Sequence, residues 1–158
     1  MNVYRQKPMA PDELLGRVDP DGKVYESRFG PDKYVGRVEV DTGKIYEARL
    51  GPDKYLGSVA LDSGKVYRHK PMAADEYLGR VDADGKFHRH KPLAPDEYLG
   101  QIADGKFHRH KPLAPDEYLG QITPMAAYAY GGAAFLLLVL PAFEESAEEK
   151  AKGEKKDQ

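Results

Sequence analysis

The chain of 158 residues contains neither cysteine nor tryptophan. Without cysteine it cannot form a disulfide framework, a thiolate zinc site, an iron–sulfur cluster or a thiol nucleophile. It also lacks an excess of charge, because 24 Lys and Arg stand against 26 Asp and Glu and the formal net charge is only −2. A nucleic-acid partner is therefore not expected, since binding to nucleic acid calls for a strong basic excess.

Targeting and catalytic motifs are missing as well. The N-terminal segment MNVYRQKPMAPDELL has no apolar run of signal-peptide length, so the expected location is the cytoplasm. The chain has no phosphate-binding loop, no nucleophile elbow, no HExxH and no GxGxxG after a strand. Its recurring aspartates fall in turns and links, where Asp has a structural role. We therefore expect no enzymatic activity and no cofactor.

One motif is copied six times with a period of about 21 residues. Each unit contains an aromatic ring, a base, a link with Pro or Gly, an Asp and the sequence Tyr-Leu-Gly or a variant of it, and in the first five units an Asp-containing turn follows before Gly-Lys. The fifth and sixth units share HRHKPLAPDEYLGQI at 88–102 and 108–122, which indicates recent duplication. The units form a repeat domain over 1–123 and lie at 4–24, 25–45, 46–66, 67–87, 88–107 and 108–123.

Each unit reads as a β-hairpin. The stretch Tyr34–Val38 alternates, which places Tyr34, Gly36 and Val38 on one face of a strand. Turn sequences such as Asp41-Thr42-Gly43 follow, and Gly accepts the positive φ that a tight hairpin loop needs. The predicted fold class is all-β, with six tandem hairpins in a closed or stacked array. If the array closes into a ring, the Tyr4-Arg5 pair should lie beside the sixth unit.

Two apolar columns of the repeat suggest packing positions. The glycine column allows a neighbouring backbone or an aromatic ring to approach closely. The column two residues before it, which is Tyr in five units and Leu14 in the first, is expected in the core. The glycine column comprises Gly16, Gly36, Gly57, Gly79, Gly100 and Gly120, and the aromatic column comprises Leu14, Tyr34, Tyr55, Tyr77, Tyr98 and Tyr118.

Two charged columns have one sign in every unit. The simplest interpretation is a belt of ion pairs between units together with Asp capping of turns, each exposed pair contributing about 0.2–1 kcal/mol. The alternative is a ring of identical sites for a charged small ligand. The basic column comprises Lys7, Arg28, Arg49, Lys70, Lys91 and Lys111, and the acidic column comprises Asp12, Asp32, Asp53, Asp75, Asp96 and Asp116.

Histidine supplies the only candidate metal ligands. His88 with His90, and His108 with His110, would each project from one face of a strand, and stacked hairpins could bring the two pairs together for zinc, nickel or copper. Other units carry Tyr, Gln, Ser or Ala in these columns, however, and duplication of HRHK accounts for the rest. We therefore expect packing or surface roles and no bound metal.

Composition changes abruptly after Thr123. Residues 124–143 carry no charge and contain the apolar run Phe135–Leu140, and as a helix they would span about 30 Å, the minimum for a bilayer crossing. The alternative is a plug or cap for the hairpin array, which suits the small residues in 126–134. Residues 144–158 are rich in Glu and Lys and are expected to form a solvated, charged tail.

The motif Tyr55-Leu56-Gly57-Ser58-Val59 followed by Asp62-Ser63-Gly64-Lys65-Val66-Tyr67 resembles the tandem hairpin repeats of bacterial β-flower proteins. It is also loosely similar to MORN repeats, although the Tyr-x-Gly-x-Trp core of those repeats is absent. The resemblance covers 4–123 and implies an all-β array, closed or open, with no reaction attached and no functional residues to carry across.

These features predict a non-enzymatic structural or interaction scaffold with a protein partner or self-association. Two alternatives stay open from the sequence. One is a repeat protein that binds a small ligand or a metal through the Lys and Asp columns or the histidines. The other is a scaffold anchored in a membrane through 124–143.

Overall fold

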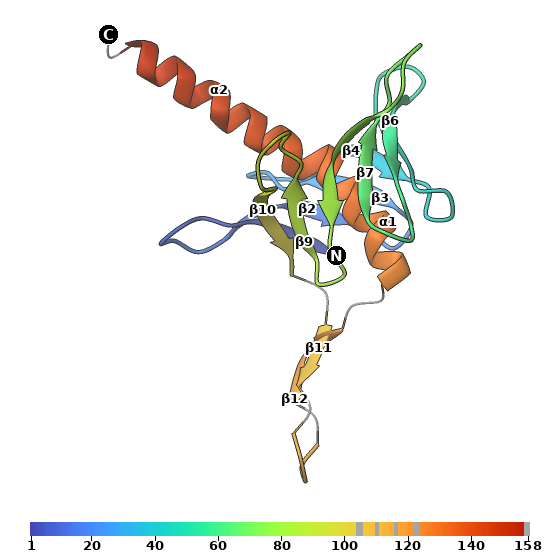
Figure 1. Ribbon diagram of the computed structural model, residues 1–158, viewed down its shortest axis with the longest axis vertical. Coiled ribbons are helices and arrows are strands. Elements are labelled where there is room, and N and C mark those ends of the chain that lie inside the picture. The colour runs from blue at the N-terminus through green and yellow to red at the C-terminus, as the bar shows by residue number, and fades with distance from the viewer. Residues whose placement is uncertain (104–105, 110, 116, 122–123, 157–158) are drawn as a thin grey trace.

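The computed structural model describes residues 1–103, 106–109, 111–115, 117–121 and 124–156. Short and longer strands alternate along the repeat domain, and a helical segment follows it (Figure 1). The all-β repeat array with a C-terminal helix is thus the observed architecture. The strands are β1 (Asn2–Arg5), β2 (Glu13–Val18), β3 (Lys23–Glu26), β4 (Lys33–Val38), β5 (Lys44–Glu47), β6 (Lys54–Val59), β7 (Lys65–Arg68), β8 (Glu76–Val81), β9 (Lys86–Arg89), β10 (Glu97–Ile102), β11 (Lys106–Arg109) and β12 (Glu117–Gln121).

The first ten strands form a closed antiparallel barrel in which each strand pairs with its neighbours in the sequence. Closure comes from β1 and β10, where Tyr4 lies opposite Gln101 and Arg5 opposite Gly100. The expectation that Tyr4 and Arg5 would lie beside the sixth unit is therefore wrong, because the fifth unit closes the ring. Strands β11 and β12 form a separate two-stranded sheet that extends away from the barrel (Figure 1).

The barrel has two different ends. Tight turns such as 19–22 join β2 to β3 and their equivalents, and we call this the turn end. Gly22, Gly43, Gly64 and Gly85 in these turns have φ between 73° and 89°, as the hairpin prediction requires. The longer segments between β1 and β2, β3 and β4, and so on are the link loops, and they define the link end.

A bulge in every described link hairpin of the barrel decides which side chains face inward. Opposite β3, Val24 pairs with Gly36 but Tyr25 pairs with Tyr34, so Val35 is an extra residue on β4. A bulge interrupts the strict alternation of a strand. Val35 and Gly36 therefore both face the core, and Tyr34 turns to the outer surface, where it is 37% exposed. The prediction that the tyrosine column lies in the core is wrong for this reason.

The glycine column is explained by the neighbouring strand. A Cβ atom on Gly36 would collide with the carbonyl oxygen of Tyr46, and one on Gly57 with that of Tyr67. The same carbonyl position meets Gly16 and Gly79. This close approach of two backbones, on the side of the strand away from the bulge, therefore requires glycine, as the sequence suggested.

The barrel interior is filled by the helical segment. Helix α1 (Pro124–Ala134) continues through a π-helical stretch, η1 (Phe135–Val139), into α2 (Leu140–Lys156). We call residues 128–140 the plug, because their buried side chains form one core with the inward side chains of the strands. Inward residues of the barrel include Val3, Val18, Val24, Val38, Ile45, Val59, Val66, Val81, Phe87, Leu99 and Ile102.

The plug enters at the turn end and leaves at the link end. Tyr130 donates a hydrogen bond to the carbonyl oxygen of Pro20 at 2.7 Å in a tight turn. At the link end, Arg5 donates through Nη1 to the carbonyl oxygen of Ala142 at 3.1 Å and to Oγ of Ser146 at 2.8 Å. Helix α2 runs on to Lys156 with its last two turns exposed, where the sequence suggested a solvated tail. Among the described residues, no helix has the length and apolarity needed to span a membrane.

Candidate interaction surface

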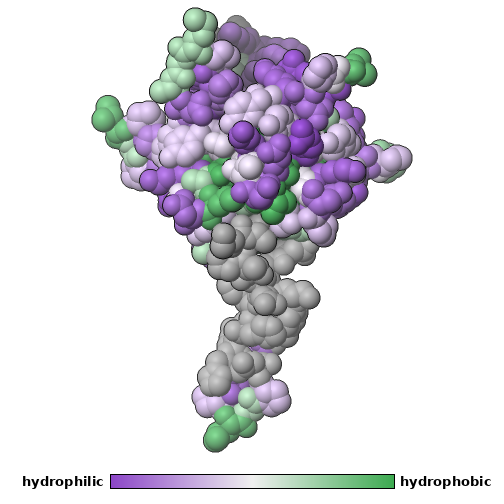
Figure 2. Space-filling model, turned by 90° about the vertical axis from the view of Figure 1, so that its right-hand side faces the viewer, coloured by the Kyte–Doolittle hydropathy of each residue, from purple (hydrophilic) through white to green (hydrophobic). Residues whose placement is uncertain are grey.

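Each link loop carries one apolar side chain at its tip. These side chains have no cover from the rest of the chain, with exposed fractions between 106% and 111%. Figure 2 shows isolated hydrophobic groups at the ends of projections around a mostly hydrophilic body. We call these side chains the apolar tips: five surround the link end of the barrel and the sixth lies on the separate β11–β12 hairpin. They are Met9, Phe29, Leu50, Met72, Leu93 and Leu113.

Four of these tips occupy a backbone conformation that disfavours them. In the first loop, the amide of Ala10 bonds to the carbonyl of Lys7 at 3.4 Å, with Pro8 second in the turn and Met9 third. Met9 has φ 59°, and Met72, Leu93 and Leu113 have φ between 60° and 62°. A positive φ at the third position normally selects Gly or Asn. For another residue it costs about 1–2 kcal/mol, so folding stability does not explain methionine or leucine here.

The basic column closes the base of four of the six loops. Nζ of Lys7 lies 3.3 Å from a carboxylate oxygen of Glu13, and Lys70, Lys91 and Lys111 repeat this pair with Glu76, Glu97 and Glu117 at 3.3 Å. Arg28 and Arg49 instead pair with Glu26 and Glu47. The hydrogen bond from Arg5 is the main reason why the pKa of Glu13 lies below its ordinary value. Exposed pairs of this kind contribute little stability, but they bracket the apolar tips with charge.

The acidic column joins neighbouring units. Asp32 accepts a hydrogen bond from Arg17, and Asp53 accepts one from Arg37 at 3.3 Å, in both cases across one unit boundary. Asp96 accepts from Arg80 in the same way, and Asp12 accepts from Gln101 at 3.5 Å across the closing seam. Asp75 faces Ser58 at this position and bonds to His69 instead, at 3.3 Å. Asp116 lies outside the described residues. Four of the five described aspartates thus join neighbouring units, whereas Asp75 pairs within its own unit, and their partners are not the basic column.

Aromatic side chains cover the outer wall in cross-strand pairs. Tyr25 lies 5.6 Å from Tyr34 between ring centroids, and Tyr46 lies 5.5 Å from Tyr55. The guanidinium of Arg17 stacks 4.2 Å above the ring of Tyr25. Partial burial in these stacks is the main cause that raises the pKa of Tyr34, Tyr77 and Tyr98. The phenols therefore act as neutral packing groups near pH 7.

The candidate metal ligands are distributed over different partners. Nε2 of His88 lies 2.9 Å from Asp82, and Nδ1 of His90 lies 3.4 Å from Asp96. His108 belongs to β11 in the separate sheet, and its side chain, like all of His110, lies outside the described residues. In the parts of the chain that the structure describes, no three His, Asp or Glu side chains gather as a metal site would require.

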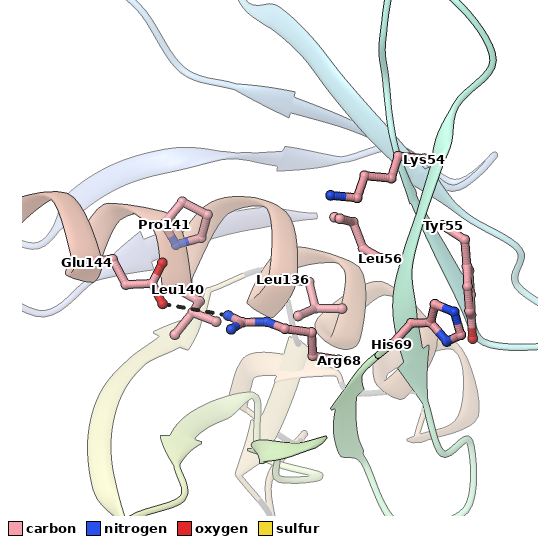
Figure 3. A pocket seen from close by; sticks show the side chains of 9 residues that line it. All are labelled: Lys54, Tyr55, Leu56, Arg68, His69, Leu136, Leu140, Pro141 and Glu144. Atoms are coloured by element: carbon pink, nitrogen blue, oxygen red, sulfur yellow. Dashed lines mark ion pairs between the residues drawn. The ribbon is translucent and has the colours of Figure 1, made fainter. Parts of the chain in front are cut away.

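A pocket of about 210 Å³ lies between the root of α2 and strands β6 and β7. Figure 3 shows Arg68 and Glu144 reaching toward each other across it, with 3.6 Å between the guanidinium and the carboxylate. His69 stacks on Tyr55, with ring centroids 4.8 Å apart. The described lining includes no serine, threonine or cysteine that could act as a nucleophile. Arg68 and Glu144 thus pair with each other, and Lys54 is the further charged side chain of the described lining.

We did not predict the apolar tips from the sequence, although the sequence contains a signal for them. Every link contains one large apolar residue, Met, Phe or Leu, between the basic column and the acidic column. A link that only connects two strands needs no such residue, since loops are normally polar.

Comparison with known proteins adds no relative to this picture. No protein-family model, no curated protein and no solved structure matches the chain. The functional interpretation therefore rests on the geometry of the barrel and its loops.

Proposed function

We propose that this protein is a non-enzymatic interaction scaffold that holds its apolar tips outward for a partner with apolar sockets. The observation that carries the proposal is the full exposure of Met9, Phe29, Leu50, Met72, Leu93 and Leu113. Single exposed apolar residues are common on protein surfaces, but here the same position is apolar and uncovered in every unit. Repetition lets several weak contacts act together on one partner.

The rest of the molecule supports a mounting role. A closed barrel has no free strand edge in its wall, and the plug fills its interior, so the link loops project from a rigid ring. Lys–Glu pairs close the base of individual loops, and the Asp belt joins neighbouring units. The tandem hairpins also favour kinship with β-flower-like repeats, for which no reaction is implied.

The proposal is tested by photo-crosslinking in the cells that make the protein. A benzoyl-phenylalanine residue replaces Phe29 at an apolar tip or, as the matched control, Lys23, which is exposed at the turn end. We expect a dominant adduct from position 29 and none from position 23. Mass spectrometry of the adduct distinguishes a protein partner from a lipid.

A second background tests whether the tips act together. The same probe at position 29 is introduced with Met9, Leu50, Met72 and Leu93 all replaced by Ser. If several tips share one partner, the adduct falls at least tenfold. Equal adducts at positions 29 and 23, or an adduct that survives the four substitutions at full yield, would exclude a scaffold that works through its tips.

A further inference from the structure

Two neighbouring segments of the chain have one sequence. Residues 83–102 and 103–122 are identical at all twenty positions. The first copy supplies β9 and β10, which occupy the barrel between β8 and β1. The second copy supplies β11 and β12, which pair only with each other in the described structure. The chain therefore contains two equivalent hairpins and one place in the barrel for them.

Backbone pairing in the barrel does not distinguish the copies. Gly100 and Gln101 of β10 lie opposite Arg5 and Tyr4 of β1. A shift of twenty residues puts Gly120 and Gln121 in the same register. On the other side, His88 of β9 lies opposite Arg80 of β8, and the equivalent residue of the second copy is His108. Every inward side chain of the first copy also has an identical counterpart.

The hairpin left outside also has the same sequence in both cases. Strands β8 and β10 both run toward the turn end, so either hairpin would emerge from that end of the barrel. The entropic cost of closing a flexible connection depends only weakly on the length of that connection. The two closures therefore differ in the point of attachment and in the tight turn at 82–85, which joins β8 to its partner strand only when the first copy fills the barrel.

We propose that the barrel closes with either copy in the same chain, and that the two closures exchange. The plug can keep its place during exchange. Gly131 already lies against Ile102 at the end of β10. The seven residue-to-residue steps from Gln121 to Tyr128 can span up to about 23 Å once the first turn of α1 is extended, which is ample for the step from the barrel wall to the helix it contacts.

Exchange alters what the scaffold presents. With the first copy in the barrel, Leu93 belongs to the ring of apolar tips and Leu113 lies at the end of the outlying hairpin. With the second copy in the barrel, these two leucines trade places, and the outlying hairpin attaches beside β8. The ring keeps five tips in either closure, and the position of the sixth changes.

Disulfide trapping tests the exchange, because the chain has no cysteine of its own. Facing residues on antiparallel strands have Cα atoms about 4.5–5.5 Å apart, within reach of a disulfide. One variant carries Tyr4→Cys with Gln101→Cys, the second carries Tyr4→Cys with Gln121→Cys, and the control carries Tyr4→Cys with Ser58→Cys on β6. Under mild oxidation we expect intrachain disulfides in the first two variants, with yields within about tenfold of each other, and none in the control.

Two further substitutions bias the closure in opposite directions. A Cβ on Gly100 would lie 2.9 Å from the carbonyl oxygen of Tyr4, so Gly100→Val should shift trapping toward Gln121. Gly120→Val should shift it toward Gln101. The proposal fails if the variant with Tyr4→Cys and Gln121→Cys forms no intrachain disulfide in the Gly100→Val background. This holds whether that variant folds or not, because the intact second copy should restore the barrel. Disulfides that join two chains would also overturn it.

Discussion

Replacing Phe135 by Ala tests whether the plug supports the barrel. Phe135 is fully buried in η1, and its ring centroid lies 6.2 Å from that of Phe87, which is fully buried on β9. The substitution removes an aromatic ring from the centre of the core and leaves a cavity. Changes of this kind lower the free energy of unfolding by about 3–5 kcal/mol.

That loss is a large share of the stability of a domain, which is typically about 5–15 kcal/mol. With a urea dependence of about 2 kcal/mol per molar, the midpoint of unfolding should fall by roughly 2 M. The melting temperature should fall by roughly 10 °C, since each kcal/mol corresponds to about 2–4 °C in a chain of this size. Urea titration followed by circular dichroism measures the first quantity and a thermal scan the second.

Phe29→Ala is the matched control, because it removes the same ring from a side chain that is 111% exposed. Its free energy of unfolding should stay within about 0.5 kcal/mol of the wild type. If Phe135→Ala proves no more destabilising than Phe29→Ala, the helical segment does not fill the barrel and the core described above is wrong.

Four further changes follow from the packing and the charges. Gly132→Leu should lower the free energy of unfolding, measured by urea titration, by at least about 1–3 kcal/mol, because the new side chain would collide with the barrel wall. In the control Gly153→Leu the new side chain meets open space, so the free energy of unfolding should not change. Deleting residues 103–122 should leave the melting temperature within a few degrees, because one hairpin copy still closes the barrel; loss of cooperative melting would contradict this. Glu13→Gln should be less stable than the wild type at neutral pH, and the difference in the free energy of unfolding should shrink on acidification. Because the pKa of Glu13 is lowered in the folded state, its carboxylate stabilises the fold above the ordinary carboxyl pKa, and this contribution is lost as the pH falls through the lowered value. Met9→Gly should not lower the free energy of unfolding, because glycine relieves the strain of a positive φ, and a measured loss above about 1 kcal/mol would mean that the tip packs on its own loop.

The hairpins could be predicted from the sequence because their determinants are local. Asp and Gly in the turns, Pro in the links and alternation in the strands act over a few residues and agree in every unit. The resulting antiparallel array is the one observed. Local signals of this kind say nothing about how many hairpins close one ring.

The face of the tyrosine column could not be predicted, because it depends on the bulge. Strict alternation places Tyr34 with Gly36 on one face, but the extra residue Val35 turns Tyr34 outward. The bulge belongs to the pairing of β4 with β3, which is a contact between strands. A single-strand pattern cannot report such a contact.

The plug explains why five hairpins close the barrel although the sequence contains six. Ala129, Ala133 and Ala134 are fully buried, and Gly131 and Gly132 lie so close to the wall that a Cβ on either would press into a valine side chain. The width of a barrel grows with the number of its strands, so a sixth hairpin would widen the interior and draw the wall away from these small residues. The void would forfeit contacts along the whole helix, since protein interiors tolerate few gaps. The size of the ring is thus decided by the segment that follows the repeats, and for that reason the repeats alone predict an array but not its closure.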